Sequence, residues 1–148
     1  MKTIITYINE KLKVSPSKHK YFPKSKNELQ TLIKELIKER GNTADLNDID
    51  VSAVKDMSGL FLGSMFNGDI SKWDVSNVTN MYQMFMESSF NGDIEDWNVS
   101  NVNQFDQMFD ASDFNGNLNK WKPKKDASME YMFDNSQMEV KLPKWFKQ

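Results

Sequence analysis

The sequence repeats itself with a period of 24 residues, and this regularity limits what the chain can fold into more than any other feature. All four tryptophans lie on one phase of the period: Trp73, Trp97, Trp121 and Trp145. A second phase holds four phenylalanines: Phe61, Phe85, Phe109 and Phe133. A period of this length is typical of a solenoid, because each unit is too small to bury its apolar side alone and must stack on its neighbours.

The pattern inside one unit predicts a short strand, a turn and a short helix. Residues 69–73 follow an Asn-Gly turn signal and are short enough to form one strand of a parallel ladder. The next apolar residues recur at spacings of three and four, as on one face of a helix: Val75, Val78, Met81 and Phe85. We therefore expect an α/β repeat solenoid with about four coils, each containing a short parallel strand and a short helix.

A sequence string within the unit carries a resemblance to a known family. The string W-D-V-S-N-V-T-N-M runs from Trp73 to Met81, and W-N-V-S-N-V begins again at Trp97. Over about Thr43 to Trp145, the chain resembles the BspA-like leucine-rich repeats of bacterial surface proteins and lipoproteins. The resemblance implies strands on one face, short helices on the other, a role in adhesion or protein binding, and no catalytic residues.

The chain divides into two expected parts. Residues 1–41 are predicted to be a helical N-terminal segment that caps the array, and residues 42–148 to be the repeat solenoid with an aromatic C-terminal cap. Ser25 and Glu28 have the spacing of a capping box, and an amphipathic pattern then continues to near Gly41. At the other end, Trp145 and Phe146 are expected to lie on the last coil.

The first residues of the chain give a second, weaker resemblance. The string Y-I-N-E-K-L from Tyr7 to Leu12 is similar to the lead segment of some bacteriophage proteins of gut bacteria. It implies a structural or accessory role in a phage or mobile element, with attachment through the N-terminal segment. The alternative is a helix that helps to cap the array.

The first residues and the hydropathy of the chain indicate where the protein is expected to be located. The first residues show no signal-peptide pattern and the chain has no cysteine for a lipid anchor, so we expect a cytoplasmic or virion-associated protein rather than a secreted one. No run of about 18 apolar residues predicts a membrane span.

Charge is segregated along the sequence. Of the 19 Lys and Arg residues, ten lie in residues 1–41 and seven from Lys120 onward, so residues 42–119 are strongly acidic. This stretch would repel a nucleic-acid backbone, which argues against nucleic acid as a partner of the repeat face. We expect the partner to be another protein with a basic surface.

The sharpest candidate site is a row of polar residues one position before the apolar row that runs from Leu46 to Leu142. If the strand pleat holds, these side chains point away from the core and form an acidic recognition strip. The row and its neighbouring phases comprise Asp45, Asp69, Asp93, Asn117 and Lys141; Asn47, Ser71, Glu95 and Asn119; and Asp48, Lys72, Asp96 and Lys120. Two alternatives are a solvated face that only discourages aggregation, and a calcium ion between Asp69 and Asp93.

Nothing in the sequence indicates an enzyme or a cofactor. His19 is the only histidine, no cysteine is present, and Gly59 and Gly63 lack the lysine of a phosphate-binding loop. The asparagines stack in two rows, which we interpret as turn-closing ladders rather than sugar-binding sites: Asn67, Asn91 and Asn115, and Asn77 and Asn101. We predict no catalytic residues, no metal site and no cofactor.

Overall fold

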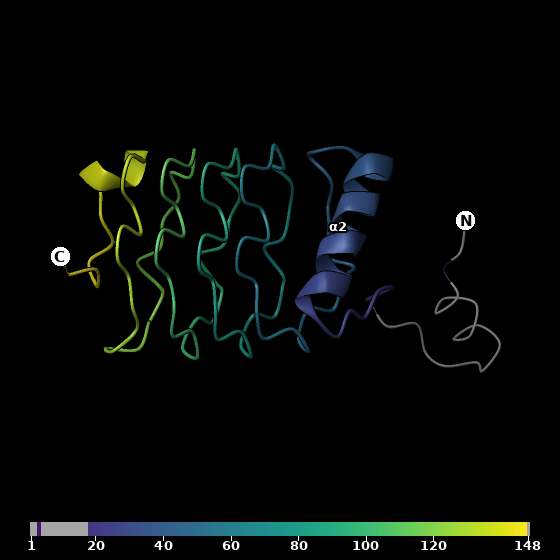
Figure 1. Ribbon diagram of the computed structural model, residues 1–148, viewed down its shortest axis with the longest axis horizontal. Coiled ribbons are helices and arrows are strands. Elements are labelled where there is room, and N and C mark those ends of the chain that lie inside the picture. The colour runs from purple at the N-terminus through teal and green to yellow at the C-terminus, as the bar shows by residue number, and fades with distance from the viewer. Residues whose placement is uncertain (1–2, 4–17, 148) are drawn as a thin grey trace.

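The 24-residue period is one turn of a wound chain. The computed structural model describes residue 3 and residues 18–147, and in it successive coils lie side by side along the long axis of the molecule (Figure 1). We define coil 1 as residues 42–65, coil 2 as 66–89, coil 3 as 90–113 and coil 4 as 114–137. Isolated parallel bridges join Asp56 to Asn80, Asn80 to Gln104 and Gln104 to Ser128, which are equivalent positions in consecutive coils.

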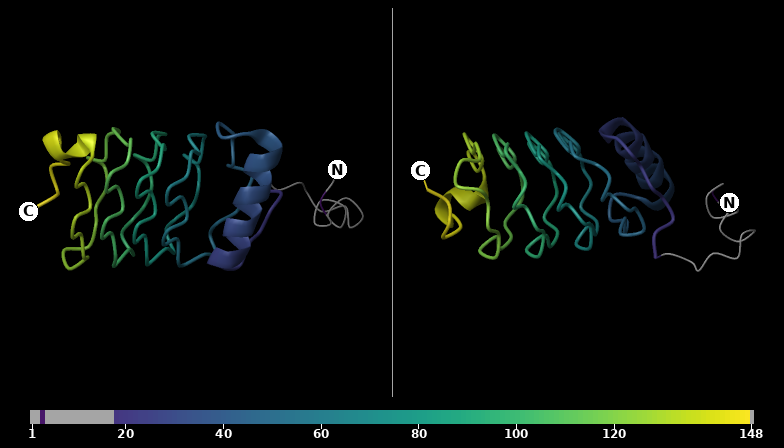
Figure 2. Two further views of the ribbon diagram at one scale, coloured as in Figure 1. Left: turned by 45° about the horizontal axis from the view of Figure 1, so that its top comes forward. Right: turned by 90° about the horizontal axis from the view of Figure 1, so that it is seen from below.

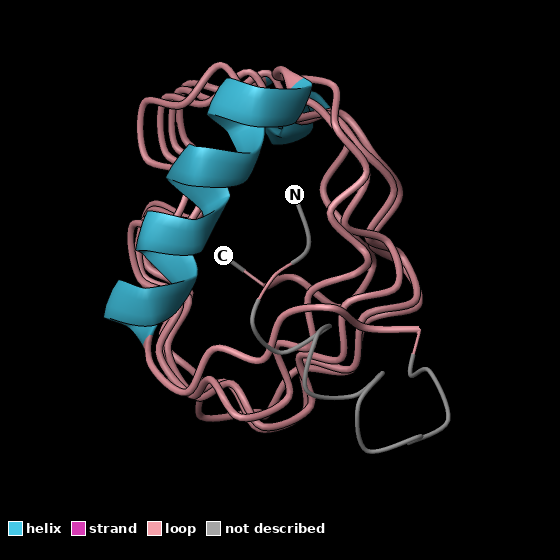
Figure 3. Ribbon diagram, turned by 90° about the vertical axis from the view of Figure 1, so that its right-hand side faces the viewer, coloured by secondary structure: helices cyan, strands magenta, loops and turns pink. Residues whose placement is uncertain are grey.

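The expected fold class, an α/β repeat solenoid with a strand and a helix in every coil, is wrong. The described residues contain one α-helix, α2 (Lys26–Arg40), and one 3-10 helix, η1 (Gln137–Val140). They form only isolated β-bridges and no sheet. Seen end-on, the coils consist of loops and turns (Figure 3).

The expected helix in each coil fails because of two residues with left-handed backbone. Gln83 and Glu87 have φ angles of 52° and 55°, and they occupy the positions of Gly59 and Gly63 in coil 1. A right-handed helix needs negative φ at every residue, so it cannot pass through these positions. The chain instead makes consecutive turns, such as the one closed by the Met84 N–H and the Met81 carbonyl at 3.2 Å. Turns of this kind reproduce the spacing of three and four in the apolar residues.

The expected strand fails because a turn follows directly after the paired residue. Asp69 forms a parallel bridge with Asp45, but its side chain then accepts a hydrogen bond from the Ser71 N–H at 2.9 Å. An Asp side chain that closes a turn in this way bends the backbone out of the extended conformation. The pairing therefore stops at a single bridge.

Aromatic rows form the core of the stack. Phe85 stacks on Phe61 and Phe109 with centroid distances of 5.5 and 5.6 Å, and Trp97 stacks on Trp73 at 6.4 Å. Offset-stacked pairs stabilise by about 0.5–1.5 kcal/mol each beyond their buried area. Every indole N–H is also paired, each with the carbonyl 27 residues earlier; that of Trp97 donates to Ile70 at 3.1 Å. The rows thus bury large aromatic surfaces without leaving polar atoms unsatisfied.

Helix α2 closes one end of the stack (Figure 2). The Ser25 hydroxyl caps it by accepting from the Glu28 N–H at 3.2 Å, and the helix ends before Gly41, as the sequence predicts. Its buried residues Leu29, Ile33 and Leu36 belong to the same apolar core as the coils. Neither described helix is long and apolar enough to cross a membrane.

The opposite end is covered only in part. Trp145 stacks on Trp121 at 6.3 Å, and Phe146 meets Phe133 edge-on at 5.1 Å. Both aromatics remain only partly buried. The phage-like string of residues 7–12 lies outside the described residues.

Candidate protein-binding face

Three exposed aspartates occupy equivalent positions on coils 1, 2 and 3. We call Asp45, Asp69 and Asp93 the acidic row. The bridge between Asp45 and Asp69 places the first two on adjacent chain segments, at the spacing of about 4.8 Å that parallel pairing imposes. In coil 4 the same position holds the neutral Asn117, so the negative charge of the row ends there.

Each side chain of the row is fixed by the turn that it closes. One carboxylate oxygen accepts a hydrogen bond from the N–H two residues further on, at 2.8 Å in Asp45, 2.9 Å in Asp69 and 3.0 Å in Asp93. Asn117 does the same with its amide oxygen at 2.9 Å. A side chain already held in one rotamer loses less conformational entropy when it binds a partner.

Two of the neighbouring predicted residues use their polar atoms to join coils. The Asn119 side chain accepts from the Lys144 N–H at 2.9 Å, and Asn47 does the same for the Lys72 N–H. The Ser71 hydroxyl donates to Asp69 at 2.7 Å. The Ser71 hydroxyl and the Asn47 amide, which donates to Asp45 at 2.9 Å, support the acidic row at the exposed surface.

Further predicted residues form ion pairs. The Lys120 ammonium lies 3.3 Å from Glu95 and 3.1 Å from Asp96, and hydrogen bonds to Asp96 and Glu95 raise its pKa. Asp48 pairs with Arg40 of α2 at 2.9 Å and so ties the helix to coil 1. The Lys141 ammonium donates to the backbone carbonyl of residue 115 at 2.8 Å. The aspartates of the acidic row form no ion pair among the described residues, although the charge of Lys72 acts on Asp69.

A shallow groove runs beside the last aspartate of the row, between coils 3 and 4. Residues 91–95 form one wall and residues 114–117 the other. The described residues contain no group of three His, Cys, Asp or Glu that could hold a metal ion, so the calcium alternative gains no support from the geometry.

Hydrogen bonding shifts the titration of the central aspartate. Bonds from the Ser71 and Asn47 side chains and from the Ser71 N–H lower the pKa of Asp69 below its usual value of 3.8. Because the pKa of Asp69 is lower in the folded state, its ionised carboxylate stabilises the folded protein at pH values above the unfolded-state pKa. This contribution is lost as the pH falls through the folded-state pKa.

We predict that Ser71→Ala raises the pKa of Asp69 toward its usual value, because the largest contribution comes from the Ser71 hydroxyl. The titration of the Asp69 carboxyl carbon, followed by NMR, measures this directly. Ser76→Ala is the control, since that hydroxyl bonds Asp74 on another corner of the same coil. If neither substitution changed the pKa of Asp69, the Ser71 hydroxyl would not be the group that lowers it.

The predicted asparagine ladders are confirmed. The Asn67 and Asn91 side chains accept from the N–H groups of Asn91 and Asn115, both at 2.8 Å. Asn77 and Asn101 donate to backbone carbonyls of the preceding coil. These amides satisfy the backbone at the corners of the coils.

The sequence interpretation missed apolar side chains on the turn side of the coils, which we define as residues 57–65 of coil 1 and the equivalent residues of the other coils. Leu62, Met65 and Tyr82 are exposed there, at 48%, 71% and 39%. The available signal was the pair Gly59 and Gly63, because two glycines four residues apart are typical of left-handed turn positions rather than of a helix.

The fold and the site together define a repeat protein whose 24-residue coils stack behind a helical cap and present a row of fixed carboxylates. Residues 28–145 match the family described as "Mycoplasma protein of unknown function, DUF285", and the chain belongs to this family. The match begins within α2 and ends at Trp145, so it spans both the helix and the stack. No curated protein and no solved structure matches the chain.

Proposed function

We propose that this chain is a non-enzymatic protein-binding module that uses the acidic row to contact a basic surface of another protein. The observation that carries the proposal is the set of three exposed carboxylates at equivalent positions on consecutive coils, each fixed by its own turn. A partner that presents Lys or Arg side chains at a similar spacing would meet all three at once.

The charge distribution supports the same partner class. Residues 42–119 contain 13 acidic residues and two lysines. A surface with this imbalance attracts basic partners over a distance and speeds their association at low salt. The resemblance to BspA-like repeats adds support, since it too implies protein binding.

The other predicted residues take a supporting place in this proposal. They flank the acidic row and would form the polar rim of the contact: Ser71, Lys72, Glu95, Asp96, Asn117 and Asn119. The phage or mobile-element alternative depends on the first residues of the chain, which the described structure does not include.

The test removes charge without removing the turn. We predict that Asp69→Asn combined with Asp93→Asn weakens binding of a lysine-rich decapeptide by about tenfold, which corresponds to about 1.4 kcal/mol. The fold should persist, because Asn117 already closes the equivalent turn in coil 4. Isothermal titration at two salt concentrations measures the affinity, and circular dichroism checks the fold.

A matched control separates this face from a general charge effect. Asp74→Asn with Glu87→Gln removes the same net charge from other exposed positions, and Asn98 already occupies the position of Asp74 in coil 3. The proposal predicts a much smaller loss for this pair. Equal losses for both pairs would show that net charge, and not the acidic row, governs binding.

A further inference from the structure

The open end of the stack presents a row of backbone donors with no acceptor. On the turn side of coils 1, 2 and 3, the backbone N–H groups of four alternate residues donate to carbonyls of the next coil. Those of coil 3 belong to Phe105, Gln107, Phe109 and Ala111, at 2.8 to 2.9 Å. The equivalent N–H groups of Met129, Tyr131 and Phe133 in coil 4 have no hydrogen-bond acceptor among the residues that the structure describes.

The fourth donor of this row shows what kind of group fits there. The Asn135 N–H donates to the Glu139 carboxylate at 2.6 Å, where a following coil would supply a carbonyl. The chain itself thus satisfies one of the four positions with an acceptor oxygen. Three positions at the same spacing remain for an external ligand. The N–H of Phe133 becomes accessible only if Phe146 moves aside, because Phe133 is 2% exposed and packs edge-on against Phe146 at 5.1 Å.

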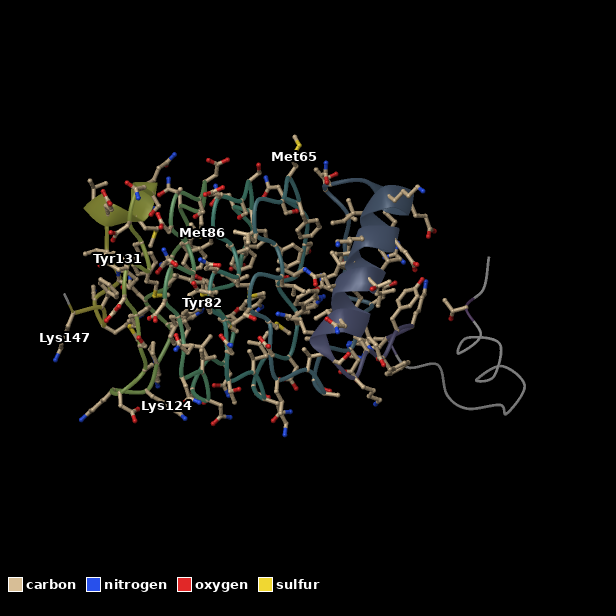
Figure 4. All side chains as sticks on the ribbon, in the orientation of Figure 1. Met65, Tyr82, Met86, Lys124, Tyr131 and Lys147 are labelled. Carbon is tan, nitrogen blue, oxygen red and sulfur yellow. The ribbon has the colours of Figure 1, made fainter. Side chains whose placement is uncertain are left out.

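The side chains around the donor row are apolar and partly uncovered. Met129 is half-buried, whereas Met57, Met81 and Phe105 at the same phase are fully buried. Tyr131 is 62% exposed. The hollow that they line also includes Trp145, Phe146 and Lys147. Tyr131 and Lys147 lie at this end of the stack (Figure 4). This is the surface that a further coil would cover.

We propose that the open end docks an extended, acidic peptide segment of another protein, which continues the hydrogen-bond ladder of the coils. An extended segment offers carbonyl oxygens at alternate residues, the arrangement that the three donors require. Lys124, Lys125 and Lys147 line the hollow and outnumber its acids Glu130 and Asp134, which favours acidic side chains on the ligand.

A second copy of the chain fits this surface less well. Its N-terminal end is covered by α2, so that copies cannot stack head to tail without displacing the helix. Two copies meeting through their open ends would place N–H donors against N–H donors. An extended segment of a different protein has no covering helix to displace, and it offers carbonyl acceptors to the N–H donors.

The test uses the full chain and a synthetic peptide with the sequence of residues 102–112. In the stack this segment supplies carbonyls to the N–H groups of coil 2, and it contains Asp106 and Asp110. We expect saturable binding, with shifted amide resonances and slower hydrogen exchange at Met129, Tyr131 and Phe133. The amides of Phe105 and Phe109, already paired, serve as internal controls.

Charge variants provide an independent readout. Lys125→Glu with Lys147→Glu should weaken binding of the peptide about tenfold. The control pair Lys34→Glu with Lys55→Glu, on α2 and coil 1, should leave its affinity unchanged. Absence of saturation at millimolar peptide, or shifts confined to the acidic row, would overturn the proposal. Protection of the three amides by self-association, seen in sedimentation, would overturn it in favour of a second copy. Loss of acidic-row binding in Asp69→Asn with Asp93→Asn does not affect this test, so the two proposals fail separately.

Discussion

Trp97→Ala is expected to lower the free energy of unfolding by about 3–5 kcal/mol, the range for removing a large buried aromatic side chain. Trp97 is 4% exposed and stacks on Trp73 at 6.4 Å. Its indole N–H also donates to the Ile70 carbonyl at 3.1 Å, and the substitution leaves that carbonyl with one hydrogen bond, from the Trp73 N–H at 3.2 Å. Urea unfolding followed by circular dichroism measures the loss. A loss below about 1 kcal/mol would contradict the role assigned to the tryptophan row.

Two further substitutions show where this energy comes from. Trp145→Ala removes the same side chain from the open end, where it is only partly buried and stacks on Trp121, so we expect about half the loss. Trp97→Phe keeps an aromatic ring but removes the N–H, and should cost about 0.5–1.5 kcal/mol, because the Ile70 carbonyl loses one hydrogen bond and keeps the one from the Trp73 N–H. Because each coil contacts only its neighbours, a defect in the middle weakens two interfaces and one at the end weakens a single interface.

The sequence was sufficient to predict which side chains stack. Identical residue types at one phase must meet once per turn if the chain is wound with that period, and the rows of Phe85 and Trp97 do so. It was not sufficient to predict the backbone between them. Apolar spacings of three and four arise both in a helix and in consecutive turns closed by i to i+3 hydrogen bonds. The φ angles of Gln83 and Glu87 distinguish the two, and in the sequence only the glycines of coil 1 indicate them.

The candidate site was predicted in part for the same reason. The exposure of Asp45, Asp69 and Asp93 followed from their place beside the apolar row. Their turn-closing hydrogen bonds did not, because an aspartate two residues before a serine or asparagine has the same appearance in a strand and in a turn. The unpaired donors near Tyr131 belong to the backbone and have no residue-type signal at all.

Gly68→Ala is expected to destabilise the protein by about 3 kcal/mol, at the upper end of the range for forcing extra atoms into a packed site. A Cβ at this position would overlap the Ala44 carbonyl oxygen of coil 1 and lie 2.6 Å from a ring carbon of Phe66. Neither group can withdraw easily. The Ala44 carbonyl accepts from the Asp69 N–H at 3.0 Å, and the Phe66 ring is fully buried against Phe90 at 6.3 Å.

Substitutions at two other glycines separate steric overlap from backbone strain. Gly92→Ala should cost less than Gly68→Ala, because the nearest backbone atom, the Gly68 carbonyl oxygen, would lie 3.0 Å from the new Cβ. Gly63→Ala should cost about 1–2 kcal/mol, the cost of a side chain in the left-handed region, since its Cβ meets nothing within 4 Å and Ala111 adopts the same conformation at φ 54° in coil 3. Thermal unfolding of the three variants tests this order. If Gly63→Ala were the most damaging, backbone strain rather than the close approach of coils 1 and 2 would explain the glycines of the repeat.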